Sequence, residues 1–94
     1  MYSIFFHKYR KIYRGDDMSN EYLDPVAVGE AISYCRRSKN ISQDVLSGLA
    51  DIGRTHLSAI ERGARKPTLE TLYRISIALD MQMSDIVQEI EKRI

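Results

Sequence analysis

Apolar residues recur at helical spacing through most of this 94-residue chain, in short runs that turn-forming residues interrupt. The first run follows Asp24 and Pro25, which are typical of the first turn of a helix. Asn40 is a residue that often ends helices, and it closes the run. The apolar positions follow the i, i+3, i+4, i+7 pattern of a buried stripe, made of Val28, Ala31, Ile32 and Cys35. The pattern therefore predicts a first helix that begins at Pro25 and stops before Asn40.

Two shorter helices are predicted next. Ser42 is a suitable N-cap for the second helix, which ends near Asp51. Its predicted buried face consists of Leu46, Leu49 and Ala50. Gly53 begins the third helix, which covers about residues 54–62 and has Leu57 and Ile60 as its only large apolar residues.

The third helix carries a second stripe, complementary to the apolar one. Its members are polar or small and again have helical spacing: Thr55, Ser58, Ala59 and Arg62, with Arg54 at the N-terminal end. A helix with this pattern is anchored on one side and presents an accessible surface on the other.

The remainder predicts two more helices. Gly63 ends the third helix, a basic loop covers residues 63–67, and Thr68 caps the fourth helix. The inner face of the fourth helix is Leu72, Ile75, Ser76 and Leu79. Asp80 interrupts it, and Ser84 is predicted to cap a fifth helix. The apolar stripe of the fifth helix is Met83, Ile86, Val87, Ile90 and Ile94. With no convincing strand over residues 24–94, the fold class is all-α, with five helices.

Residues 1–23 have a different character, with many aromatic residues and no clear helical or strand period. We expect them to form an N-terminal extension, set apart from a domain over residues 24–94. An ordered arm, a flexible tail and an upstream addition all fit this composition. A purine-rich stretch resembling a ribosome-binding site can encode Arg14-Gly15, so we hypothesise that Met18 is a translational start.

Composition and charge exclude several classes of protein. The single cysteine forms no internal disulfide and no multi-cysteine zinc site, and His7 and His56 lack metal-ligand spacing, so we expect neither metal nor cofactor. No apolar run has the length of a membrane helix, and a reducing, cytoplasmic setting is the default. Residues 36–66 hold seven Lys/Arg against three acidic residues, within a net charge of only +1. Such a stretch is either a patch for an anionic partner or an ordinary solvated face.

The two short helices and the tight turn between them decide between these readings. A second helix that exposes polar groups, with basic residues on its flanks, is the helix-turn-helix arrangement that enters the major groove of DNA. No catalytic constellation is present, because His56 has no serine, cysteine or carboxylate placed to form a triad, so we do not expect an enzyme.

Three motifs carry a family resemblance: SQDVLS at residues 42–47, IGRTHLSAIERG at 52–63 and KPTLETL at 66–72. They resemble the lambda repressor/Cro (XRE-like) helix-turn-helix family over about residues 26–88. The resemblance implies a five-helix, lambda-repressor-like fold that binds operator DNA as a dimer. The turn departs from the family pattern, with Asp51 in place of glycine and Gly53 in place of a serine or threonine cap.

The resemblance also implies roles for individual residues. Gln43 would contact a phosphate and help orient a neighbour on the recognition helix. Base-facing positions fall on Arg54, Thr55, Ser58 and Ala59, and backbone-contacting positions on Arg62, Arg65 and Lys66, with His56 bordering this surface and able to touch a phosphate. Arg36 and Glu61 occupy the positions of a buried ion pair that maintains the fold.

The expected function is sequence-specific transcription regulation at a pseudo-palindromic site in double-stranded DNA. We expect a homodimer, with the interface on Ile86, Val87, Ile90 and Ile94. Two alternatives remain. One is an antitoxin whose protein partner binds the C-terminal helix or the N-terminal arm. The other is a protein-interaction module that no longer reads DNA.

Overall fold

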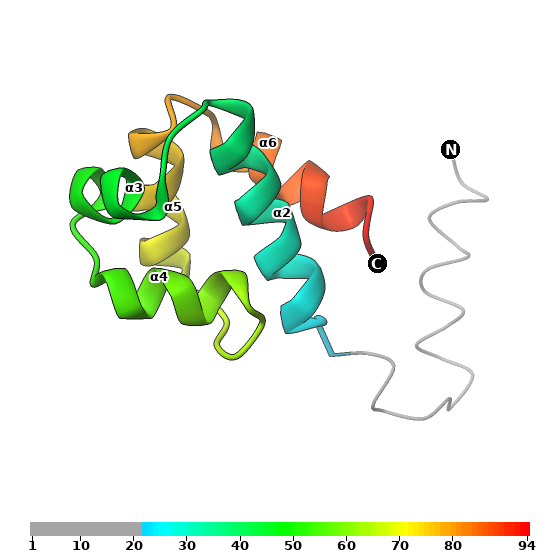
Figure 1. Cartoon of the computed structure of the whole chain (residues 1–94). Helices are drawn as coiled ribbons and strands as arrows, with labels where there is room; N and C mark the ends of the chain where they lie inside the picture. The colour runs from blue at the N-terminus through cyan, green and yellow to red at the C-terminus, as the bar shows by residue number, and fades with distance from the viewer. Residues whose placement is uncertain (1–21) are drawn as a thin grey trace, which may run out of the picture.

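The computed structural model describes residues 22–94, which form five helices and no strand (Figure 1). The helices are α2 (Pro25–Ser38), α3 (Gln43–Ala50), α4 (Arg54–Glu61), α5 (Leu69–Ala78) and α6 (Met83–Glu91). The expected all-α, five-helix fold is confirmed. The predictions for the segment before residue 22, including the Met18 start, lie outside the described residues.

Local capping explains where most of these helices begin. The Asp24 side chain accepts a hydrogen bond from the Val26 N–H, Ser42 from the Val45 N–H and Thr68 from the Thr71 N–H. Each bond satisfies one of the donors that the first turn of a helix leaves without a partner. The three caps confirm the sequence prediction.

The fifth predicted cap was wrong. α6 begins one residue before Ser84, with Gln82 as its N-cap. The Asp85 carboxylate accepts a hydrogen bond from the Gln82 N–H at 3.0 Å, so an acidic side chain in the first turn closes this end. The Ser84 hydroxyl lies 3.2 Å from the Gln82 side-chain oxygen instead of capping the helix.

Left-handed residues separate the helices. Asn40, Asp51 and Asp80 have φ values of 60°, 55° and 55°, and Gly63 has φ 78°. Asparagine and aspartate tolerate this conformation better than other residues with side chains. Asp51, which stands where the family pattern has glycine, adopts this left-handed conformation, and the chain enters α4 through Gly53.

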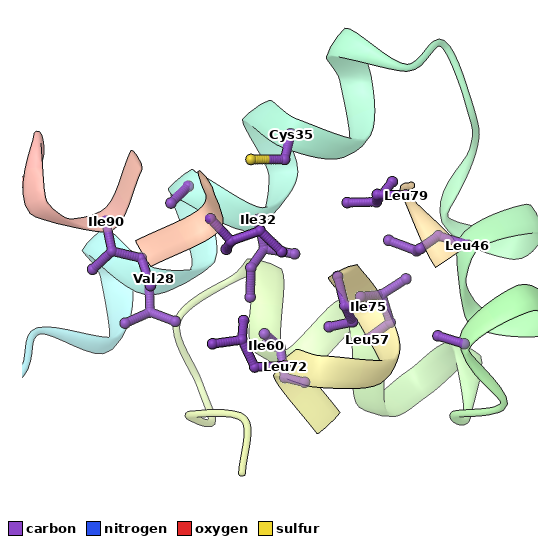
Figure 2. Close-up of a cluster of buried hydrophobic side chains, with 13 residues drawn as sticks. Val28, Ile32, Cys35, Leu46, Leu57, Ile60, Leu72, Ile75, Leu79 and Ile90 are labelled. Carbon is purple, nitrogen blue, oxygen red and sulfur yellow. The ribbon is translucent and has the colours of Figure 1, made fainter. Parts of the chain in front are cut away.

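The core lies where all five helices meet, and α2 is packed against both α4 and α6 (Figure 2). Its fully buried side chains include Ile32, Leu46, Leu57, Ile60 and Ile75. The predicted inner faces of α2 and α5 are confirmed. Leu49 was predicted to be buried, but it is 62% exposed, because α3 turns Leu46, Ser47 and Ala50 inward and leaves Leu49 on its other side.

Gly29 permits the close approach of α2 to α4. A Cβ atom at this position would overlap the backbone carbonyl oxygens of Ile60 and Glu61. A side chain of any size would therefore push the two helices apart. Glycine at this position holds the C-terminal end of α4 close to α2.

Candidate nucleic-acid interface

α4 has one face in the core and the other toward solvent. Leu57 and Ile60 are fully buried, whereas Arg54, Thr55 and Arg62 are exposed. Ser58, Ala59 and His56 lie between these extremes. In Figure 1, α4 runs along one edge of the molecule, on the side opposite the turn between α5 and α6. The structure thus brings the predicted base-facing residues onto one accessible helix face that carries no large apolar side chain.

The C-terminal end of α4 is fixed by a buried ion pair. Arg36 Nε lies 2.8 Å from Glu61 Oε2, and Arg36 Nη2 lies 2.9 Å from Glu61 Oε1. The remaining terminal nitrogen, Nη1, donates to the Ile41 carbonyl oxygen at 3.0 Å. Side-chain exposure is only 12% for Arg36 and 5% for Glu61. The pair joins α2 to α4, as the family resemblance implied.

Gln43 adds a third member to this cluster. Its Nε2 donates to Glu61 Oε1 at 2.8 Å, which joins the first residue of α3 to the last residue of α4. Gln43 was expected to orient a neighbour on the recognition helix. The neighbour that it contacts is the inward-facing Glu61 and not one of the base-facing residues.

The cluster determines the charge state of Glu61. Burial alone would raise the pKa of its carboxyl group, but the hydrogen bonds from Arg36 and Gln43, together with the charge of Arg36, outweigh burial and place the pKa below its ordinary value. The hydrogen bond to Glu61 also raises the pKa of Arg36. Both partners are therefore charged at neutral pH.

The N-terminal end of α4 carries a second, exposed ion pair. Arg54 Nε lies 2.8 Å from Asp44 Oδ1, and side-chain exposure is 51% for Arg54 and 81% for Asp44. Asp44 stands in the first turn of α3. The sequence prediction missed this contact, because periodicity within one helix does not report contacts between two helices. The signal that could have found it is the tight turn, which keeps α3 in contact with α4.

The basic loop after α4 carries two cationic side chains, Arg65 and Lys66. Arg65 is exposed. Lys66 is also exposed, and its Nζ lies 3.4 Å from the carbonyl oxygen of Leu23, which precedes α2 in the chain. Together with Arg62, these residues place three cations beside the C-terminal end of α4.

The residues predicted for a dimer interface do not share one surface. Ile86 and Ile90 are 0% and 6% exposed within a single chain, so they belong to the monomer core. Val87 and Ile94 are exposed. The α6 stripe therefore serves mainly to complete the bundle, which corrects the assignment of the whole stripe to an interface.

Residues 22–94 contain no group of three or more His, Cys, Asp or Glu side chains that could hold a metal ion. No helix in the same range is long and apolar enough to cross a membrane.

Comparisons with known proteins agree with this geometry. A helix-turn-helix family model matches residues 32–86, which is more than half of the chain. Control protein C.BamHI of Bacillus amyloliquefaciens is 40% identical over 60 residues, covering 63% of this chain and 74% of that protein. The immunity repressor of Bacillus phage phi105 is 36% identical over 64 residues, covering 68% of this chain and 44% of the repressor. The restriction-modification controller protein C.AhdI from Aeromonas hydrophila has a similar structure, with a TM-score of 0.66 and 29% identity over 69% of this chain and 98% of that one.

The chain therefore belongs to the lambda-repressor-like (XRE-like) helix-turn-helix family, whose members are DNA-binding transcription regulators and not enzymes. Within this class, α3 and α4 are the helix-turn-helix pair, and α4 is the helix that follows the turn.

Proposed function

We propose that this protein binds a pseudo-palindromic operator as a homodimer in the cytoplasm, with α4 in the major groove, and regulates transcription there. The observation that carries the proposal is the outer face of α4. It presents a guanidinium, two hydroxyls and a methyl group, on a helix whose inner face is packed and whose C-terminal end is fixed by Glu61.

The side chains on this face suit the edges of base pairs. Arg54 can make a bidentate contact with guanine, Thr55 can contact a thymine methyl group, and the hydroxyl of Ser58 can donate or accept. Ala59 allows close approach. Phosphate contacts fall to Gln43, His56, Arg62, Arg65 and Lys66, which would position α4 without reading sequence.

A two-fold dimer needs an apolar surface that the monomer leaves exposed. The structure offers such a stripe on α5, where Leu69, Tyr73 and Ile77 follow each other at i, i+4 and i+8 and are 75%, 50% and 61% exposed. We place the interface on this stripe, together with Val87 of α6 and Ile94, which follows the end of α6. Paired on this surface, two recognition helices would meet successive major grooves about 34–36 Å apart.

Selection of bound duplexes from a random DNA pool at physiological salt tests the DNA-binding part. We expect a two-fold symmetric motif for the natural sequence and its loss in the double variant Arg54→Ala/Thr55→Ala. Lys92→Ala, which removes a cation from the far end of α6, is the matched control and should retain the motif. Failure of the natural protein to enrich any motif would contradict operator binding and favour a protein-interaction module.

Sedimentation velocity tests the dimer. Tyr73→Glu/Ile77→Glu places two charges on the proposed interface, and both side chains are exposed in the monomer, so the fold should survive. We expect a monomer with an unchanged melting temperature and a weakened operator complex. A variant that remains a dimer would place the interface elsewhere on the molecule.

A further inference from the structure

The exposed pair between Asp44 and Arg54 is the feature that the proposed function leaves without a role. A carboxylate on a surface that faces polyanionic DNA is repelled by the phosphates and weakens binding. Asp44 lies beside the first residue of the recognition helix and contacts its predicted base-reading side chain. Its position therefore links it to base reading and not to a gain in affinity.

The atoms that form the contact indicate how the link works. Asp44 Oδ1 contacts Arg54 at Nε, the innermost nitrogen of the guanidinium group. Among residues 22–94, the two terminal nitrogens of Arg54 donate no hydrogen bond. A guanidinium group has five donors in a planar fork, so the carboxylate can hold the plane at Nε while four N–H donors remain for another acceptor.

The buried ion pair at the other end of α4, between Arg36 of α2 and Glu61, has a different arrangement. All three nitrogens of Arg36 donate to protein oxygens, so that fork is held at every nitrogen. The amide hydrogen that Gln43 donates to Glu61 is not available to orient Arg54. Asp44 thus joins α3 to the N-terminal end of the recognition helix through an ion pair.

We propose that Asp44 is a positioning residue, which orients the Arg54 guanidinium toward a base pair and keeps it from the neighbouring phosphates. A free arginine at a helix end can swing to a phosphate, which strengthens binding to every sequence equally. A carboxylate that holds Nε restricts this swing and adds repulsion toward phosphate. Asp44 therefore lowers affinity for all DNA and raises discrimination at one base pair.

The inference rests on the proposed function, and the test separates the two. The motif selected by the natural protein comes first, because its absence would defeat operator reading before Asp44 is examined. The base pair read by Arg54 is the position whose preference disappears in Arg54→Ala. Affinities are then measured, with the full chain, for the operator, for its three substitutions at that pair and for an unrelated duplex.

Asp44→Asn keeps the shape of the side chain and removes its charge. We expect discrimination at the Arg54 base pair to fall about 2–5-fold, the effect of losing one exposed ion pair. Preferences at all other positions should persist, and binding to the unrelated duplex should strengthen. In an Arg54→Ala background, Asp44→Asn should change discrimination no further. Asp80→Asn, an equal loss of charge at an exposed turn away from α4, is the matched control and should leave discrimination unchanged.

Three results would overturn the inference. Discrimination could be unchanged in Asp44→Asn, or preferences could weaken equally at every position together with a lower melting temperature, which indicates a role in folding. Arg54→Ala could also weaken all duplexes uniformly, which would make Arg54 a phosphate contact. In each case a symmetric operator motif from the natural protein would leave the proposed function intact.

Discussion

The two ends of α4 each carry an ion pair between an arginine and a carboxylate, in two different settings. At each end an arginine Nε lies 2.8 Å from a carboxylate oxygen. The pair at Glu61 is buried and the pair at Asp44 is exposed. The distances are equal, but the energies are not, because the loss of one partner leaves an uncompensated charge only where water is excluded. An equal distance therefore does not make the two pairs equal: the Glu61 pair is buried and has a second hydrogen bond from Arg36 Nη2, so we expect it to be the pair that maintains the fold.

The largest effect should come from the buried end. Arg36→Ala leaves the Glu61 carboxylate buried without its cation, and we expect a loss of about 3–5 kcal/mol in the free energy of unfolding. Urea denaturation followed by circular dichroism measures it. DNA binding should fail because the domain loosens, although Arg36 contacts no base.

The exposed end supplies the control for this prediction. Arg54→Ala should change the free energy of unfolding by less than about 1 kcal/mol. The double replacement Arg36→Met/Glu61→Leu removes both buried charges and should recover most of the lost stability. Equal stability losses in Arg36→Ala and Arg54→Ala would refute the contrast between the two ends.

A smaller effect should follow from widening the contact between α2 and α4. Gly29→Ala places a methyl group against the backbone carbonyls of Ile60 and Glu61, which cannot rotate away. We expect a loss of roughly 1–3 kcal/mol. Gly48→Ala is the matched control, since nothing lies within 4 Å of its added methyl group, and it should gain about 0.5–1 kcal/mol. Thermal denaturation of both variants should give shifts of opposite sign.

The smallest effect is the pH dependence that the buried pair creates. The pKa of Glu61 is lowered from 4.5 in the folded chain. The contribution of the ionised Glu61 carboxylate to folding stability is therefore fully present above about pH 4.5. This contribution declines as pH falls through the lower, folded-state pKa. As pH is lowered below 4.5, the urea concentration at the unfolding midpoint should decrease for the natural protein. It should decrease less steeply for Glu61→Gln. Parallel curves for the two proteins would exclude Glu61 as a source of the acid sensitivity.

Local chemistry made much of the fold predictable from the sequence. Caps such as Ser42 and Thr68 depend on side chains a few residues from the helix that they begin. Leu49 was placed wrongly because spacing in an eight-residue helix fits two faces, and the core selected the one with the small Ser47.

The site was less predictable, because its contacts join separate helices. Periodicity located the polar face of α4, and the family resemblance supplied the pairing of Arg36 with Glu61. Neither one indicates that Asp44 reaches Arg54, because this contact depends on how the turn orients α3 against α4. Burial of Ile86 and Ile90 was also undetermined, since an apolar stripe packs equally well against its own chain or a second copy.

Cys35 can report chemically on separation of the helices that bury it. It is the only cysteine in the chain, it is 1% exposed in the core between α2 and its neighbours, and burial raises the pKa of its thiol (Figure 2). A thiol reagent can reach it only when the helices separate, so the rate of labelling under native conditions measures that opening without an engineered probe. DNA that binds only the closed bundle should slow the labelling in proportion to the fraction bound, which connects occupancy of α4 to the kinetics of the core.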